Sequence, residues 1–297
     1  MPWPAEALRL ERDFSVADVR LHVHDWPGGR DPVVCLPGVS ASGRSFDGLA
    51  AALAPDWRIL AVDPRGRGRS SRPRHGYGYQ VHAADTVALI DLLGFEQVVL
   101  VGHSFGGIVA ALLAAWYPER VRGLVLVDGG AEIPAALRGA IDLVISGLDV
   151  VYPSPRAFLD VLSRAPALQP WTPEIADFFR SSLDVLPGGG VRAETRAWVA
   201  AQDLRAYWDG PPDFAAVHTA IRCPTLVVRA AGGLAGASGT LLPGPVCARL
   251  LAGIRSARLV DVAATHYTVL LGRPSATIAA VKAFLAELGR PTPSSAV

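Results

Sequence analysis

The sequence predicts an α/β protein with a doubly wound, mostly parallel sheet and an inserted helical lid. Three observations lead to this fold class. Short apolar runs alternate with helical stretches, a long middle segment lacks strand character, and the apolar runs return after it. Continuous apolar runs are typical of strands that are buried on both faces, and their alternation with helices indicates right-handed parallel crossovers.

Six apolar runs are expected to be strands of the sheet. They are residues 32–36, 59–62, 98–101, 124–127, 225–228 and 258–262. A helix rich in Ala and Leu is expected from Ile108 to Tyr117, and a last helix from Ser275 to Leu288. We therefore expect residues 1–130 and 218–290 to form the α/β core of the 297-residue chain.

The segment 131–217 is expected to be a helical cap, or lid, inserted into that core. Its pattern is helical but is broken repeatedly by proline and by the run Gly188-Gly189-Gly190, and we expect no strand in it. Residues 291–297 are expected to be a disordered tail.

Composition and charge exclude several classes of function. The chain has 28 Lys and Arg against 27 Asp and Glu, so neither nucleic acid nor a membrane is an expected partner. Three cysteines without CxxC spacing predict reduced thiols. The first residues do not read as a signal peptide, and no apolar run approaches the ~20 residues of a membrane span. A cytoplasmic, bacterial protein is expected, and the oligomeric state stays open.

The strongest chemical signal is the run Gly102-His103-Ser104-Phe105-Gly106-Gly107. It contains a Gly-x-Ser-x-Gly motif and stands between an expected strand and an expected helix. In that context the motif predicts a sharp, strained turn that exposes the serine hydroxyl. The helix N-terminus adds partial positive charge there. We therefore expect Ser104 to be a nucleophile.

A serine hydroxyl needs a base within hydrogen-bond reach to act as a nucleophile. Of the seven histidines, His266 is the best placed, because it follows the last expected strand at the carboxyl edge of the sheet. His103 is adjacent to Ser104, but its side chain is expected to point away from it. His22 and His24 lie on one face of an early strand and are expected to be surface residues.

The order of these motifs resembles that of the α/β-hydrolase superfamily. The resemblance rests on Leu36-Pro37-Gly38, on Asp63-Pro64-Arg65-Gly66-Arg67-Gly68-Arg69-Ser70, on the Ser104 turn and on His266. It covers nearly the whole chain, and small bacterial serine esterases with a helical lid are the nearest look-alikes. It implies the α/β-hydrolase fold and a hydrolytic reaction. Asp63 and Arg65 are expected to order a loop below the active site.

The family's oxyanion hole uses two backbone amides, which the resemblance assigns to Val39 and Phe105. Phe105 directly follows the serine. Val39 follows Pro37-Gly38, where the family usually has His-Gly. A backbone donor survives that replacement, and such donors stabilise the charge that develops on the substrate carbonyl oxygen.

The resemblance leaves the acid of the triad open. Most family members place it after the strand that follows the lid, but residues 214–260 contain no Asp or Glu. Asp128 is the expected substitute, because some hydrolases of this fold keep their acid there and its strand neighbours the nucleophile strand. Asp203 and Asp261 are weaker candidates, and a Ser–His dyad without an acid is a further alternative.

The apolar and aromatic lid favours a small to medium hydrophobic ester or lactone as substrate. The expected activity is that of a carboxylesterase-like serine hydrolase that forms an acyl-enzyme on Ser104. The alternatives are C–C bond hydrolysis of a diketone with the same Ser and His, and a non-catalytic ligand-binding protein on a hydrolase scaffold. No metal constellation or dinucleotide motif is recognised, so no metal and no cofactor are expected.

Overall fold

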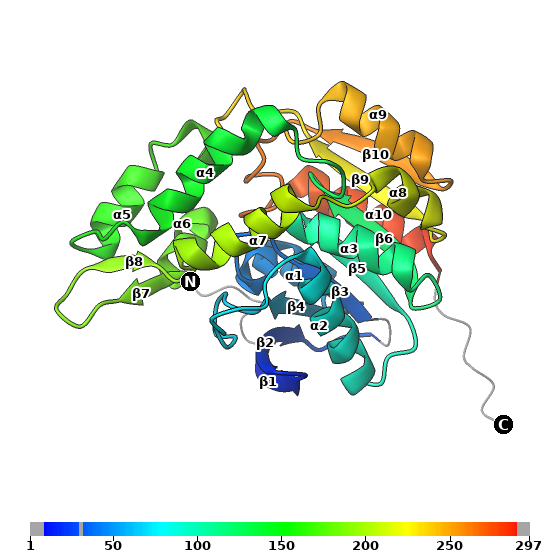
Figure 1. Cartoon of the computed structure of the whole chain (residues 1–297), viewed down its shortest axis with the longest axis horizontal. Coiled ribbons are helices and arrows are strands. Elements are labelled where there is room, and N and C mark those ends of the chain that lie inside the picture. The colour runs from blue at the N-terminus through cyan, green and yellow to red at the C-terminus, as the bar shows by residue number, and fades with distance from the viewer. Residues whose placement is uncertain (1–8, 30–31, 290–297) are drawn as a thin grey trace.

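The computed structural model describes residues 9–29 and 32–289, and the expected tail, 291–297, lies outside them. One eight-stranded sheet runs through the molecule in the order β1-β2-β4-β3-β5-β6-β9-β10 (Figure 1). Its strands are β1 (Leu10–Val16), β2 (Val19–Trp26), β3 (Pro32–Leu36), β4 (Arg58–Asp63), β5 (Val98–His103), β6 (Val121–Val127), β9 (Thr225–Ala230) and β10 (Ala257–Val262). The predicted fold class is confirmed.

Parallel pairing dominates the sheet because helices connect its buried strands. The strands from β3 to β10 in this sheet pair in parallel, whereas β2 is antiparallel to both β1 and β4. Every residue of β3 and β5 is buried, as their continuous apolar runs predict. Since β5 and β6 are adjacent, the residues that follow them, Ser104 and Asp128, lie at the same edge of the sheet.

Helices cover both faces of the sheet. They are α1 (Asp47–Leu53), α2 (Tyr79–Leu92), α3 (Phe105–Trp116), α8 (Phe214–Ala220), α9 (Gly244–Gly253) and α10 (Ser275–Glu287), and a 3₁₀ turn, η2 (Gly43–Phe46), precedes α1. One core cluster contains residues of α2, α3, α8 and α9, and the cluster on the other face contains residues of α1 and α10. Helix α3 is buried continuously from Phe105 to Ala114, so the serine turn has a rigid support.

The helical insertion, residues 131–213, lies beside this core (green to yellow-green in Figure 1). Its elements are η3 (Ala135–Leu137), α4 (Arg138–Ser146), η4 (Gly147–Asp149), α5 (Pro155–Leu162), η5 (Pro166–Leu168), α6 (Pro173–Ser181), β7 (Leu183–Val185), β8 (Val191–Ala193) and α7 (Ala197–Asp209). The expectation of no strand here is wrong, because β7 and β8 form an antiparallel hairpin. Gly189 and Gly190, at φ values of 85° and 82°, allow its turn instead of only interrupting a helix.

Two helices join the insertion to the core. Helix α7 contacts α4 within the insertion and α2 in the core, whereas α8 packs on α3 and α9. The expected boundary at residue 217 therefore falls inside a helix that packs with the core. In the described part of the chain, no helix is both long enough and apolar enough to span a membrane.

Candidate active site

Ser104 occupies the turn between β5 and α3 in a backbone conformation that is rare for residues with a side chain. Its φ is 55° and its ψ is −121°. A Cβ atom on Gly102 would lie 2.4 Å from the carbonyl oxygen of Gly106, and a Cβ atom on Gly106 would lie 2.1 Å from that of Leu36. Strand, turn and helix therefore approach too closely for a larger residue at these two positions.

His266 lies on the loop after β10, and its imidazole reaches the serine. Its Nε2 lies 3.0 Å from Ser104 Oγ, and the residue is 3% exposed. Two reciprocal hydrogen bonds hold the loop. The Thr265 amide donates to Thr268 Oγ1 at 3.0 Å, and the Thr268 amide donates to Thr265 Oγ1 at 3.2 Å. These bonds fix the backbone on both sides of His266.

Asp128 directly follows β6 and is completely buried. Its Oδ2 lies 2.7 Å from His266 Nδ1, and its Oδ1 accepts a hydrogen bond from the Ala230 amide at 3.1 Å. The structure thus brings three residues named from the sequence, Ser104, His266 and Asp128, into one hydrogen-bonded chain. A carboxylate in this position can orient an imidazole and stabilise the imidazolium that forms when it accepts a proton.

The two other acids considered from the sequence lie in different surroundings. Asp203, on α7, forms a buried ion pair with Arg67. Asp261, on β10, pairs with Arg229 at the surface, with 2.6 Å between carboxylate oxygen and guanidinium nitrogen. Neither is the carboxylate that bonds His266.

His103 packs against the proposed base and does not bond Ser104 in the way a base would. Its ring stacks on that of His266, with 4.8 Å between ring centroids and an angle of 27° between planes. Its Nε2 lies 2.9 Å from the backbone carbonyl oxygen of His266. Burial, with a contribution from His266, lowers the pKa of His103 to about 3. A neutral His103 therefore supports His266 without placing a second positive charge beside it.

The two backbone amides expected to form the oxyanion hole belong to residues near Ser104. Phe105 begins α3, and Val39 lies on the loop after β3. A Cβ atom on Gly38 would lie only 3.4 Å from Ser104 Cβ, and Val39 and Phe105 both line the same cavity as the serine. The amide of Ala41 donates to the Gly38 carbonyl oxygen at 3.1 Å and closes a turn there. The loop therefore lies directly against the expected nucleophile.

A cavity of about 400 Å³ lies between the core and the insertion, with Ser104 and His266 in its wall. Most of its lining is apolar and comes from the insertion, including Ile141, Ile145, Leu148, Phe158, Leu168, Phe178, Phe179 and Leu204. Among the described residues that line it there is no Lys or Arg. A cavity of this volume and lining suits an uncharged ligand of small to medium size.

Glu194, which the sequence did not point to, is the one acidic residue among the described residues of the cavity wall. It directly follows β8. Its amide donates to the Ser182 carbonyl oxygen at 2.9 Å, and its own carbonyl oxygen accepts from Arg72 Nη2 at 2.9 Å. Burial raises the pKa of Glu194 to about 7, and the nearby Asp63 carboxylate adds to this shift. A titratable group therefore lies in an otherwise apolar wall.

His22 and His24 are buried, and the expectation that they are surface residues is wrong. They lie on β2, which is flanked by β1 and β4. Each imidazole bonds a carboxylate, that of Asp13 at 2.8 Å for His22 and that of Asp63 at 3.1 Å for His24. Glu11 completes a group whose N and O atoms lie within 4.8 Å of one another, but arginine guanidinium groups already pair with its carboxylate. The arrangement is thus explained by hydrogen bonds and ion pairs.

Comparison with known proteins agrees with this fold. Residues 31–152 match the α/β-hydrolase fold family. The chain is 37% identical over 123 residues to a 3-hydroxybutyrate-oligomer hydrolase of Cupriavidus necator, covering 40% of this chain and 42% of that protein. It is 33% identical over 165 residues to a 2-hydroxymuconate semialdehyde hydrolase of a Pseudomonas strain, covering 54% and 57%. The chain thus spans about half the length of these two curated relatives.

The fold is also that of a solved hydrolase. The crystal structure of E-2-(acetamidomethylene)succinate hydrolase superposes with a TM-score of 0.81 and covers 94% of this chain and 99% of that one. Sequence identity between the two is 24%, so the likeness is one of fold.

Proposed function

We propose that the chain, whose residues 31–152 match the α/β-hydrolase fold family, is a serine hydrolase of small to medium hydrophobic carboxylic esters or lactones. The observation that carries this proposal is the hydrogen-bonded chain from Asp128 through His266 to Ser104, which ends in an apolar cavity. A nucleophile, a base and a group that orients the base are the parts that acyl transfer requires.

The reaction follows from these positions. Ser104 Oγ attacks the ester carbonyl carbon as His266 Nε2 takes the hydroxyl proton, and Asp128 stabilises the resulting imidazolium. The carbonyl oxygen becomes an oxyanion and accepts hydrogen bonds from the amides of Val39 and Phe105. Collapse of this intermediate breaks the C–O bond, and His266 returns the proton to the leaving alcohol. Water then cleaves the acyl-enzyme by the same steps in reverse.

The charge of the cavity supports an uncharged substrate. A substrate carboxylate would meet no Lys or Arg among the described residues of the wall, and it would meet the acidic Glu194. Removing a carboxylate from water without a cationic partner is costly. Neutral esters and lactones fit this wall better than anionic acids do.

C–C bond hydrolysis of a diketone is the second candidate. The observation in its favour is that the similarity to the 2-hydroxymuconate semialdehyde hydrolase extends over 54% of this chain, against 40% for the 3-hydroxybutyrate-oligomer hydrolase. The same serine and histidine would serve both reactions, so only turnover of esters compared with turnover of a diketone can distinguish them.

The test is turnover of a series of p-nitrophenyl esters of increasing acyl length, together with labelling by a fluorophosphonate. The wild type should turn over the esters and carry the label on Ser104. Ser104→Ala should lose both, with a fall in kcat of at least ~10³-fold. Ser146→Ala, which removes an exposed hydroxyl on the insertion, is the matched control and should behave as the wild type does.

Each other outcome has a definite meaning. Labelling of Ser104 with turnover of a diketone but not of esters would replace the proposal by C–C hydrolysis. Neither labelling nor turnover by a folded wild type would contradict a serine hydrolase and would favour a ligand-binding protein.

A further inference from the structure

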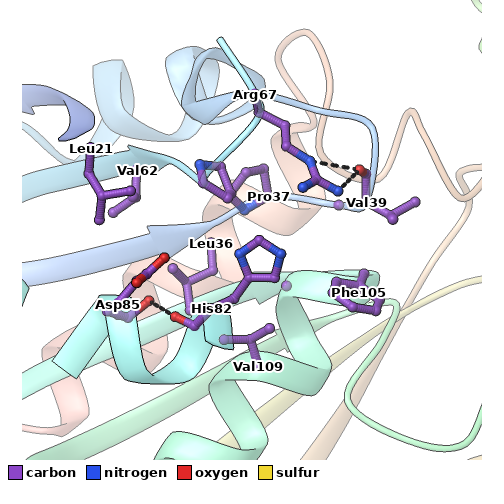
Figure 2. Close-up of a pocket in the computed structure, with 14 residues that line it drawn as sticks. Leu21, Leu36, Pro37, Val39, Val62, Arg67, His82, Asp85, Phe105 and Val109 are labelled. Atoms are coloured by element: carbon purple, nitrogen blue, oxygen red, sulfur yellow. Dashed lines mark hydrogen bonds between the residues drawn. The ribbon is translucent and has the colours of Figure 1, made fainter. Parts of the chain in front are cut away.

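The loop after β3, residues 37–42, carries the expected oxyanion donor Val39 and is called the oxyanion loop below. It is held at two successive carbonyl groups. The Gly38 carbonyl oxygen accepts from the Ala41 amide at 3.1 Å. The Val39 carbonyl oxygen accepts from Arg67 Nε at 3.0 Å and from Arg67 Nη2 at 2.6 Å (Figure 2). In a planar trans peptide the C=O and N–H groups point in opposite directions, so the bond to Gly38 directs the Val39 N–H. Arg67 fixes the next peptide unit.

Arg67 is itself held rigidly. It is 1% exposed, and its Nη1 donates to the Arg65 carbonyl oxygen at 3.0 Å. Its counter-ion is Asp203 of helix α7, which is completely buried. The planar guanidinium group can donate hydrogen bonds to a carbonyl oxygen and to a carboxylate at the same time, whereas the ammonium group of a lysine has no such fixed donor geometry.

Asp203 is bound from the core as well. Its Oδ1 accepts from the Gly78 amide at 2.5 Å and lies 2.9 Å from His82 Nε2. Burial alone would raise the pKa of Asp203, but Arg67 and His82 hold it well below its ordinary value. The carboxylate is therefore ionised at neutral pH, and its charge stays paired with that of Arg67.

We propose, on the basis of the function proposed above, that Arg67 is a positioning residue for the Val39 oxyanion donor and that Asp203 links this donor to helix α7. The oxyanion hole then depends on the insertion as well as on the core. Neither Arg67 nor Asp203 donates a hydrogen bond to the reacting atoms in this proposal. Both act through the orientation of the loop after β3.

The proposal differs from a merely structural ion pair in what it predicts for the kinetic constants. An oxyanion donor acts mainly on the transition state, so its misplacement lowers kcat and leaves KM nearly unchanged. Loss of a whole donor typically costs about 10²–10³-fold, and a misplaced donor should cost less. We expect Arg67→Met to lower kcat about 10- to 100-fold and to weaken inhibition by a trifluoromethyl ketone, which forms an oxyanion on Ser104, by a similar factor.

Arg65→Met is the matched control. Arg65 is also buried and also pairs with an aspartate, Asp85 at 2.7 Å. Its other side-chain bonds go to the Gly76 carbonyl oxygen and to Asp18, so the loop that it orders is not the one that carries Val39. It should lose stability but keep its kcat per folded molecule. Arg67→Lys, the milder variant, keeps a charge beside Asp203 and should fall between Arg67→Met and the wild type.

Hydrogen exchange of the segment 37–42 gives a readout that does not need activity. Exchange of this segment should be faster in Arg67→Met and in Asp203→Asn than in the wild type, and unchanged in Arg65→Met. Unchanged exchange in Arg67→Met and Arg67→Lys, or equal losses of kcat in Arg67→Met and Arg65→Met, would overturn the proposal. A wild type without turnover or labelling would instead contradict the function, while the exchange result would still decide the role of Arg67.

Discussion

Asp128 and Asp203 are two completely buried aspartates with similar immediate partners and different surroundings. Each bonds a histidine, at 2.7 Å to His266 Nδ1 and at 2.9 Å to His82 Nε2. Each also accepts a hydrogen bond from a backbone amide. By these bonds alone, either pair resembles the acid and base of a triad.

The two pairs differ at the imidazole nitrogen that does not bond the aspartate. His266 Nε2 meets Ser104 Oγ at 3.0 Å, in the wall of the 400 Å³ cavity. His82 Nδ1 has no hydrogen-bond partner among the described residues, and His82 lines a small cavity together with Pro37, Gly38 and Val39 of the oxyanion loop (Figure 2). Asp203 also forms an ion pair with Arg67, whereas Asp128 has no arginine partner among the described residues. A buried Asp–His pair therefore indicates catalysis only where the second imidazole nitrogen reaches a nucleophile.

The largest expected contrast between the two aspartates is in turnover. Asp128→Asn should lower kcat about 10³- to 10⁴-fold, because the amide no longer stabilises the imidazolium of His266. Asp203→Asn should lower it by about 100-fold or less, because Asp203 acts only through the oxyanion loop. Steady-state kinetics on the preferred ester measures both. Equal losses would show that the two aspartates do not differ in their role, and near-normal turnover in Asp128→Asn would leave a Ser–His dyad.

The stability of the fold should depend much more on Asp203 than on an aspartate at the surface. Asp203→Asn should lower the free energy of unfolding by about 3–5 kcal/mol, because it leaves the buried Arg67 guanidinium without its counter-ion. The double variant Arg67→Met/Asp203→Leu should recover most of this loss. Asp261→Asn, which breaks an ion pair at the surface, should cost about 1 kcal/mol or less. Urea denaturation compares the three, and equal losses in Asp203→Asn and Asp261→Asn would contradict the buried pair as a source of stability.

Glu194 extends the comparison to an acidic residue in the cavity wall. No histidine bonds its carboxyl group among the described residues. At pH 8, above its pKa of about 7, the carboxyl group is mostly ionised, and its negative charge should disfavour anionic substrates. Glu194→Gln should therefore raise kcat/KM for p-nitrophenyl glutarate about 10-fold, roughly what 1.4 kcal/mol of repulsion accounts for. Turnover of p-nitrophenyl valerate, which has the same chain length and no charge, is the control and should change little. An equal change for both esters would show that Glu194 acts through the shape of the cavity.

The smallest expected effect is on the pH dependence of stability. The pKa of Glu194 is raised from 4.5 to about 7, so the folded state binds more protons than the unfolded state between these values. The free energy of unfolding should therefore fall as pH rises through this window. The full shift corresponds to about 3 kcal/mol, and solvent screening of this half-buried group should reduce the fall to about 1 kcal/mol. Glu194→Gln should show a shallower fall. Urea denaturation at pH 5 and pH 8 measures the difference, and parallel curves would contradict the raised pKa.

The sheet and the residues at its edge were predictable because local patterns specify them. Ser104 and Asp128 each directly follow a continuous apolar strand, and adjacent parallel strands bring such residues together. His266 lies on the loop that follows the last strand, four positions after its end at Val262. Their catalytic roles stay predictions until the variants are measured.

The remaining features depend on contacts that no local pattern encodes. Arg67 and Asp203 are 136 positions apart, and only the packing of α7 against the core brings them together. Glu194 reaches the cavity through the β7–β8 hairpin, whose three-residue strands are too short to give a periodic signal. The histidines of β2 are buried by carboxylate partners on neighbouring strands, and a strand taken alone does not reveal such partners.

The position of Asp128 also has a consequence for laboratory evolution of the protein. The carboxylate that bonds His266 comes from the end of β6, so the loop 231–239 after β9 contributes no side chain to that hydrogen-bonded chain. Leu234 lines the cavity, and Ala235, Ala237 and Ser238 are exposed. A library at these four positions can therefore explore new substrate preferences while the nucleophile, the base and their acid keep their geometry.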